Sequence, residues 1–461
     1  MENVIKEAKL VTYLSETDIG TDVHIVREKI MDKDNPDDFK YDIKIIENYK
    51  RPFWITKPFY RKYKDKKEAE DTNKVDKFTS TQSELFRNVA KRLGDTYALL
   101  NNPRVVRDSP YVYGLDVDAR TIIKYKYLKK YDTVTPNRYA ALDIEKNILT
   151  DDLVVISLSS DYGIYVGILN KLVWEEKEPI SKLKEMYDKY IPDVEIKRKA
   201  KVEFKIFTDE LSMLKWIFKK ANELNVDIIG VWNIKYDIPE IIETLNKYGV
   251  DIADIAHYDK IPSKYKYFKF IPGVAVKKTA SGKMVPKSPE EIWNIVRSTT
   301  NYYLIDAMST HRYVRVGGAT VSGGYSLDNI LKEEGVAQKL KFDTGGVNQG
   351  AEWHIYMVRN KPLEYVIYNV WDTMSMVELD RKTEDIRITL DLLLGVSHYD
   401  IFNSGPKRII DALFFFYLKH KKVLGTKPNK MEDDKILGLD NWIVTLPGYR
   451  IMDNGLPLLC E

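Results

Sequence analysis

Two carboxylates stand two residues apart in an otherwise apolar run, Asp143 and Glu145 within residues 139–145. The run has the composition of a β-strand, in which side chains two positions apart share a face. Two carboxylates held that close repel each other unless a cation lies between them, and a hard divalent ion with oxygen ligands suits the spacing. A polar strand end in water would show the same triplet, so this motif alone leaves both interpretations open.

A third carboxylate, Asp237, comes shortly after the apolar strand pattern of residues 226–231. At that place it would lie at the carboxyl edge of a sheet, where the sites of α/β proteins gather. It could equally cap a helix that starts at about Pro239, with Glu240 completing a capping box. The two roles are compatible, because a helix start beside a metal site can serve both.

The third motif is the pair Tyr368 and Asp372, inside a predicted helix over 362–385. Residues four apart lie on one helix face, so the phenol and the carboxylate point to the same place. An acidic ligand with a phenol near a metal-bound water is what orienting a nucleophile requires. Such a pair is also unremarkable on any amphipathic helix.

From Arg138 onward, strands alternate with helices, and these elements must position the three motifs. The pattern predicts strands at 139–145, 153–158, 164–168, 226–231 and 302–306, and helices at 210–224, 239–248 and 362–385. This is an α/β layer fold with a mixed sheet, preceded by about 135 residues of α+β character. Asp306 ends one of the strands, and we assign it a structural role. After residue 385 the pattern is helical to about Val423 and then irregular.

Two segments carry features suited to nucleic acid. Residues 49–67 interleave eight Lys or Arg with six aromatics, Phe53 and Trp54 among them. Cations alternating with aromatics suit single-stranded nucleic acid, but a strand with its aromatics packed inward reads the same way. Residues 273–287 read as a projecting hairpin whose lysines, Lys277 and Lys278 included, suit backbone contact or simply face water.

The composition of the 461 residues excludes several classes of protein. The net charge of +3 gives no global basic field, so nucleic-acid binding requires local patches. One cysteine, Cys460, excludes a disulfide framework and a cysteine-based zinc site, and the six histidines show no ligand spacing. No run approaches the ~20 apolar residues of a membrane helix, and the first residues lack a signal-peptide core. We therefore expect a cytoplasmic protein (host cytoplasm if the source is viral) with no membrane partner.

The motifs together resemble the front half of a family B DNA polymerase of the T4-like bacteriophage type. Asp143, Glu145, Asp237 and Asp372 with Tyr368 match the family's DEDD exonuclease pattern in its tyrosine-bearing form. Similar segments are 141–145, 230–239, 325–330 and 365–372, with 49–60 resembling a strand of the family's N-terminal domain. The resemblance implies an N-terminal α+β domain (1–137), an RNase H-like 3′–5′ exonuclease domain with a mixed sheet (138–384), a helical return to the N-terminal domain (385–427) and the incomplete start of a palm (428–461).

The resemblance also implies how the site would work. Asp143, Glu145 and Asp372 would hold one Mg²⁺, and a second would be bridged by Asp143 and supported by Asp237, with Mn²⁺ able to substitute. Tyr368 would orient the attacking water. Asn233 would contact the 3′-terminal nucleotide, and the further substrate contacts expected are Tyr236, Phe53, Trp54, Lys277 and Lys278. The implied substrate is the 3′ end of DNA, single-stranded or at a primer–template junction.

The departure from the family is the absence of its polymerase motifs. Neither the Asp-x-x-Ser-Leu-Tyr-Pro-Ser segment nor the Tyr-Gly-Asp-Thr-Asp turn occurs. We therefore expect primer extension only with a separately encoded polypeptide that carries the palm, fingers and thumb, unless the chain is a truncated product. The alternatives are a freestanding 3′–5′ exonuclease and a non-catalytic nucleic-acid-binding scaffold for a polymerase subunit.

Overall fold

The computed structural model describes residues 4–36, 38–94, 103–279, 282–315, 321–344, 346–347, 350–426, 448–451 and 457–460. The chain forms two compact units. The larger comprises residues 1–51, 81–83 and 117–412, and the smaller comprises 52–80, 84–116 and 413–461. The beginning of the chain thus belongs to the same unit as the strands that follow Arg138. The domain layout implied by the resemblance, with divisions at 137, 384 and 427, stays a prediction.

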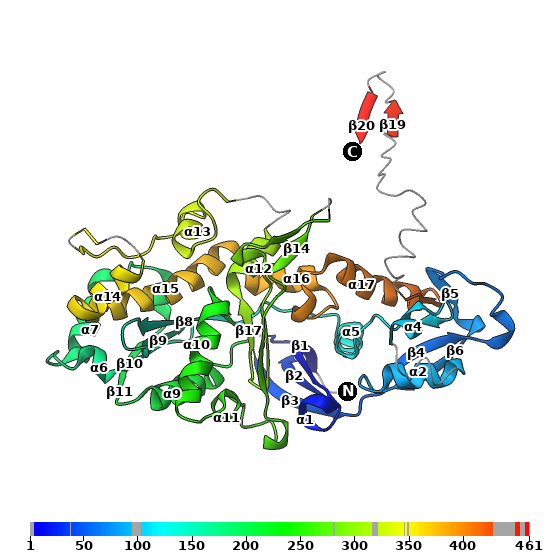
Figure 1. The fold of residues 1–461 in the computed structure, drawn as a ribbon, viewed down its shortest axis with the longest axis horizontal. Helices are drawn as coiled ribbons and strands as arrows, with labels where there is room; N and C mark the ends of the chain where they lie inside the picture. Colours follow the sequence, from blue (N-terminus) through cyan, green and yellow to red (C-terminus); the bar gives the residue numbers. More distant parts are fainter. Residues whose placement is uncertain are drawn as a thin grey trace. The chain divides into compact units, whose positions relative to one another are not determined.

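A mixed eight-stranded sheet organises the larger unit (Figure 1). Its strands, in spatial order, are β11 (Val202–Phe207), β10 (Gly163–Leu169), β9 (Asp152–Ser160), β8 (Tyr139–Asn147), β12 (Ile228–Val231), β17 (Tyr303–Asp306), β16 (Ile295–Ser298) and β13 (Phe268–Ile271). β12 runs parallel to both β8 and β17, and β9 runs antiparallel to β8. The predicted α/β fold with a mixed sheet is confirmed, and each of the five predicted strands is present.

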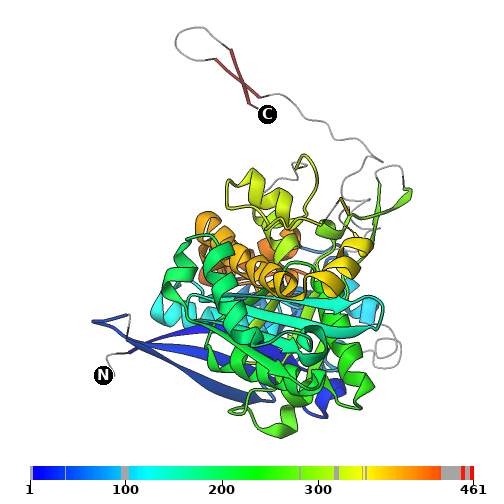
Figure 2. The same ribbon diagram turned by 90° about the vertical axis from the view of Figure 1, so that its left-hand side faces the viewer.

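Helices cover both faces of this sheet. Successive side chains of a strand point to opposite faces, and here both sets are apolar, so each face packs against helices. On β8, Ala140, Leu142 and Ile144 belong to the core shared with α9 (Glu210–Glu223) and α10 (Ile234–Lys247). Tyr139 and Ala141 belong instead to the core shared with α15 (Pro362–Thr383). Figure 2 shows α15, in yellow to orange, and the green α9–α10 pair on opposite sides of the sheet. Asp143 and Glu145 continue the series of Tyr139 and Ala141, so they face the α15 layer.

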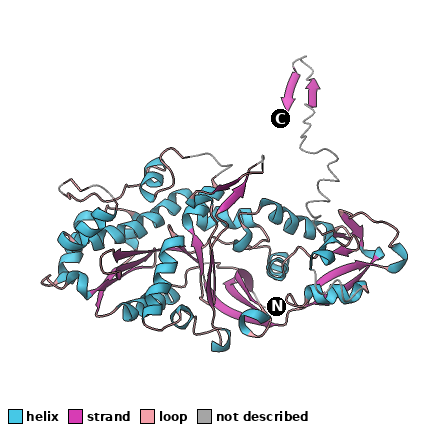
Figure 3. Ribbon diagram, in the orientation of Figure 1, coloured by secondary structure: helices cyan, strands magenta, loops and turns pink. Residues whose placement is uncertain are grey.

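The remaining elements of the larger unit surround this core (Figure 3). β1 (Val4–Leu14), β2 (Val23–Asp32) and β3 (Phe39–Glu47) form an antiparallel sheet, and β14 (Val276–Lys278) pairs with β15 (Met284–Pro286) as the predicted hairpin. The other helices are α1 (Glu16–Ile19), α5 (Ala119–Tyr131), α6 (Asn170–Val173), α7 (Pro179–Tyr190), α8 (Glu195–Lys199), α11 (Ile252–Ala256), α12 (Ala307–Val314), α13 (Leu327–Glu333), α14 (Ala351–Asn360), α16 (Leu390–Leu394) and the first half of α17 (Gly405–Lys419). A π-helical turn over Asp385–Thr389 follows α15, and the short η6 (Tyr399–Ile401) precedes α17.

Over its described residues, the smaller unit consists of short strands and helices. β4 (Arg51–Thr56) lies between β6 (Val75–Ser80) and β7 (Val112–Tyr113), β5 (Ala69–Asp71) pairs with β18 (Lys422–Leu424), and β19 (Gly448–Ile451) pairs with β20 (Pro457–Cys460). Its helices are α2 (Leu85–Leu93), α4 (Pro103–Asp108) and the end of α17. Most of the segment expected to begin a palm, 428–461, lies outside the described residues.

Across the part of the chain that the structure describes, none of the helices combines the length and the apolar character needed to cross a membrane.

Candidate metal centre

Three acidic side chains converge between the central sheet and α15. Asp143 and Glu145 project from β8, Asp372 projects from α15, and each offers a carboxylate oxygen within 4.8 Å of the others. Glu145 and Asp372 are buried and Asp143 is partly buried. A divalent ion with oxygen ligands fits such a group, because carboxylates that close together and withdrawn from water need a compensating cation. This group could therefore hold a metal ion.

Asp237 lies beside this group without being a member of it. It occupies the first turn of α10, is 3% exposed, and its Oδ2 atom has no hydrogen-bond partner among the described residues. Its charge acts on Asp143, and the charge of Glu145 acts on it. A buried carboxylate oxygen left without a donor is costly, so this atom also fits a place beside a bound cation.

The helix that carries Asp237 begins earlier than expected. Asn233 is its N-cap residue, whereas the sequence predicted a start at about Pro239 with Asp237 as the cap. Pro239 is accommodated inside the helix, and Glu240 forms an ion pair of 2.5 Å with Lys146 rather than a capping box. The expectation that Asp237 is the cap is therefore wrong, and its side chain stays available to the acidic group.

The pKa values of the acidic residues also favour a bound cation. Burial and the neighbouring carboxylates Asp237 and Glu145 raise the pKa of Asp143 well above its ordinary value. Burial, with the charge of Glu145, does the same to the pKa of Asp237. Burial also raises the pKa of Asp372 to about 6, although the ammonium of Lys339 opposes that shift. Carboxylates so arranged resist ionisation until positive charge reaches them, and a divalent cation supplies it.

Lys339 is a member of the site that the sequence did not indicate. Its Nζ donates to Tyr368 Oη at 2.9 Å and to Asp372 Oδ2 at 2.5 Å. Lys339 lies in an irregular segment after α13. Its backbone N–H donates to Asp328 Oδ1 at 3.1 Å, and the preceding carbonyl, of Gln338, accepts from Trp371 Nε1 at 2.9 Å. No sequence spacing relates this lysine to α15, so its place in the site follows only from these tertiary hydrogen bonds.

Two further residues of α15 hold the carboxylates of β8. Tyr365 donates its hydroxyl to Glu145 Oε2 at 2.6 Å, and Asn369 donates to Asp143 Oδ2 at 2.7 Å. His354 on α14 lies 2.7 Å from the Tyr365 hydroxyl. Residues 365, 369 and 372 share one helix face, so the same four-residue spacing that singled out Tyr368 and Asp372 could have indicated them.

Four of the expected substrate contacts fall into two groups. Asn233 and Tyr236 are exposed at the start of α10, next to Asp237. Partial burial, with the charges of Glu240, Asp237 and Glu145, raises the pKa of Tyr236 above its ordinary value. On the hairpin, Lys278 is exposed, whereas Lys277 forms an ion pair of 2.6 Å with Glu291. The first group therefore lies at the site, and nothing in these contacts links the hairpin lysines to it.

Phe53 and Trp54 are not available to stack on a base, which corrects the expectation that they bind substrate. They are 1% and 5% exposed in the smaller unit, where Phe53 contacts Phe78 and Trp54 contacts Phe414. The packed-strand interpretation of this part of the chain holds because other elements cover β4: Phe53 shares a core with residues of α2, and Trp54 packs against α17.

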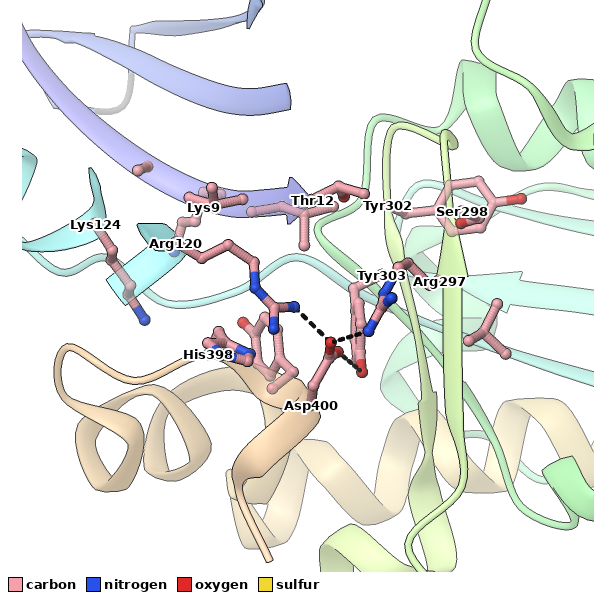
Figure 4. A pocket seen from close by; sticks show the side chains of 15 residues that line it. Lys9, Thr12, Arg120, Lys124, Arg297, Ser298, Tyr302, Tyr303, His398 and Asp400 are labelled. Atoms are coloured by element: carbon pink, nitrogen blue, oxygen red, sulfur yellow. Dashed lines mark hydrogen bonds and ion pairs between the residues drawn. The ribbon is translucent and has the colours of Figure 1, made fainter. Parts of the chain in front are cut away.

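A separate cavity in the larger unit also gathers charged groups, but the carboxylate among them, Asp400, is already paired (Figure 4). Asp400 on η6 accepts from Arg120 at 2.5 Å and from Tyr303 at 3.2 Å, and it pairs with Arg297 at 3.5 Å. Burial alone would raise the pKa of Asp400, but Arg120 lowers it to about 2. This network joins α5, the central sheet and η6.

Comparison of the chain with protein-family models and with curated protein sequences finds no match. The geometry of the metal centre and the motifs themselves therefore indicate what the chain does.

Proposed function

We propose that this chain is a metal-dependent 3′–5′ exonuclease with an RNase H-like catalytic domain that removes nucleotides from DNA 3′ ends. The observation that carries the proposal is the convergence of Asp143, Glu145 and Asp372, with Asp237 alongside and Tyr368 one helical turn from Asp372. These five residues are the ones that the DEDD pattern selects, and they come from three separate elements.

The roles of the residues follow from their contacts. Asp143, Glu145 and Asp372 would hold the ion, with Asp237 completing the acidic set for a second one. Bound Mg²⁺ or Mn²⁺ would supply a nucleophilic water at neutral pH and neutralise charge at the phosphorus. The hydroxyl of Tyr368 would accept a hydrogen bond from Lys339, as it does at 2.9 Å, and donate a hydrogen bond to the attacking oxygen, which orients that oxygen. Tyr365 and Asn369 keep the two carboxylates of β8 in place.

The four carboxylates of the site make a non-catalytic scaffold the poorer proposal. Four carboxylates beside a nucleic-acid groove weaken phosphate binding unless cations neutralise them. A protein that only bound DNA would therefore gain from losing them. We also propose that this exonuclease is the proofreading half of a split replicative polymerase, with the palm motifs on a separately encoded partner.

The test is hydrolysis of 5′-labelled single-stranded DNA by the purified chain with Mg²⁺. Activity should stop with EDTA, and Asp143→Ala should lower the rate at least ~10³-fold, because loss of a metal ligand removes several kcal/mol of transition-state stabilisation. Asp152→Ala is the matched control, since Asp152 begins the neighbouring strand and pairs with Lys171 at the surface. Full activity in EDTA would falsify the proposal.

A further inference from the structure

A concave site lies between α5 and the sheet of β1–β3, and none of its residues belongs to the metal centre. It encloses about 390 Å³, within the range of sites that hold small ligands. Its floor is apolar, because Ile46 and Ile123 contribute to the small core between helix and sheet. Its walls carry four lysines and three tyrosines, Lys6, Lys44, Lys126, Lys130, Tyr49, Tyr127 and Tyr131.

The charge of this site is positive and uncompensated. Its single carboxylate, Glu28, is already engaged by Lys6 at 3.0 Å and by the hydroxyl of Tyr127. Within the described chain, no carboxylate lies within the 4.0 Å of an ion pair from Lys44, Lys126 or Lys130, and all three side chains are exposed. An anion entering here would therefore displace water rather than break existing ion pairs.

The lysines are interleaved with aromatic rings. Lys126 Nζ lies 4.7 Å from the ring centre of Tyr49, and Lys130 Nζ lies 4.8 Å from that of Tyr131. The three tyrosines are partly buried, so their rings are held while the lysines remain movable. Rings that can stack on bases, with cations beside them for phosphates, are how proteins bind single strands without reading sequence.

We infer that this groove binds a short stretch of single-stranded DNA, separately from hydrolysis at the metal centre. Bases would stack on Tyr49 and Tyr131, and backbone phosphates would pair with Lys44, Lys126 and Lys130. An acidic protein segment would use the lysines but not the rings. Paired DNA could not offer its bases to the tyrosines, because they are already stacked within the duplex.

The experiment measures binding of a fluorescent (dT)₁₂ to the full chain by anisotropy, in EDTA so that no hydrolysis occurs. Lys130→Glu should weaken binding about 5-fold or more, and Lys126→Glu with Lys130→Glu about 10-fold or more. Losing two phosphate contacts should make the slope of log K against log salt shallower by about 1.4. Tyr49→Leu, which keeps an apolar side chain but removes the ring, should weaken binding about 5-fold.

Lys129→Glu is the matched control, because it is the neighbouring exposed lysine of the same helix, makes the same change of charge and does not line the groove. It should change the affinity less than about 2-fold, the level expected of a screened surface charge. Equal weakening by Lys129→Glu and Lys130→Glu would overturn the inference in favour of a diffuse charge effect.

Three competitors separate the possible ligands. Duplex DNA and poly-glutamate should compete poorly with (dT)₁₂, and dTMP at equal nucleotide concentration should not displace it. Displacement by dTMP would assign the site to a free nucleotide, and effective competition by poly-glutamate would assign it to a protein partner. Either result overturns the inference. Because the readout is binding in EDTA, it stands or falls independently of the exonuclease proposal.

Discussion

Lys339 Nζ lies 2.5 Å from Asp372 Oδ2 and 2.9 Å from Tyr368 Oη, so one ammonium bridges two residues one helical turn apart on α15. Burial by itself would lower the pKa of Lys339, but Asp372 and Tyr368 raise it above the ordinary value, so the lysine stays charged. The ammonium offsets part of the negative charge of the acidic group. It also directs a lone pair of the Tyr368 hydroxyl, which leaves the tyrosine proton to donate elsewhere.

Replacing Lys339 by alanine should separate catalysis from metal binding. The rate of hydrolysis should fall by ~10–10³-fold, because Tyr368 loses the donor that orients it. Mn²⁺ affinity, measured by calorimetry, should rise, since a competing cation leaves Asp372. Lys341→Ala, two residues away and exposed, should change neither quantity. An unchanged rate for Lys339→Ala would reduce this lysine to a structural ion pair.

Tyr368→Phe keeps the ring, which lies 4.8 Å from that of Trp353, and removes only the hydroxyl. The rate should fall by ~10–10³-fold, less than for Asp143→Ala, on the scale of general acid–base catalysis. Metal affinity should hardly change, because the phenol is not a ligand in this scheme. If the variant hydrolyses DNA as fast as the original chain, the tyrosine serves only packing.

The substrate should be an unpaired 3′ end. Single-stranded or 3′-mismatched DNA has no terminal pair to melt, so both should be degraded faster than a fully paired duplex, with release of mononucleotides. The assay follows 5′-labelled and 3′-labelled strands in parallel. Nucleotides released first from the 5′ end, or cuts within a circular strand, would exclude this polarity.

A partner should cover part of α17. In the smaller unit Phe416 is 55% exposed and Leu413 is 37% exposed, and exposed apolar side chains grouped in this way are typical of interfaces. We expect a 1:1 complex with a polypeptide that carries the missing palm motifs, in which primer extension appears and editing is kept. Phe416→Glu should weaken the complex about 10-fold or more on size exclusion, as expected for a buried aromatic anchor.

The matched control for the partner experiment is Trp174→Glu, which changes an aromatic side chain that is 70% exposed in the larger unit. It should leave the complex intact. Separate elution of the two polypeptides at micromolar concentration would leave a lone nuclease as the better account.

Acid should destabilise the larger unit through His398. Burial lowers the pKa of His398 to about 3, below the 6.5 of an unfolded chain. Between these values the unfolded chain binds the extra proton, so the stabilisation is complete above pH 6.5 and is lost as the pH falls toward 3. The loss amounts to at most about 5 kcal/mol. The free energy of unfolding, measured with urea at several pH values, should depend less steeply on pH in His398→Phe. Its dependence on pH should be unchanged in His420→Phe, which alters an exposed ring.

The local features of the site could be predicted from sequence because they depend on short-range periodicity. The two-residue repeat of a strand places Asp143 and Glu145 on one face, and the four-residue repeat of a helix does the same for Tyr368 and Asp372. The order of strands and helices likewise follows from composition that alternates along the chain. These periodicities depend on neighbours only a few residues away in the sequence, and the predicted strands and helices are present in the folded chain.

What only the tertiary structure decided is which distant residues meet. Lys339 reaches the site from an irregular segment anchored by Asp328 and Trp371, and no spacing in the sequence connects these three. The composition of the basic and aromatic run at 49–67 fitted both a nucleic-acid surface and a packed strand, and in the structure Phe53 enters a core while Tyr49 lines a groove with α5. Burial depends on what covers a strand, and that cover comes from elements far along the chain, so composition alone could not assign it.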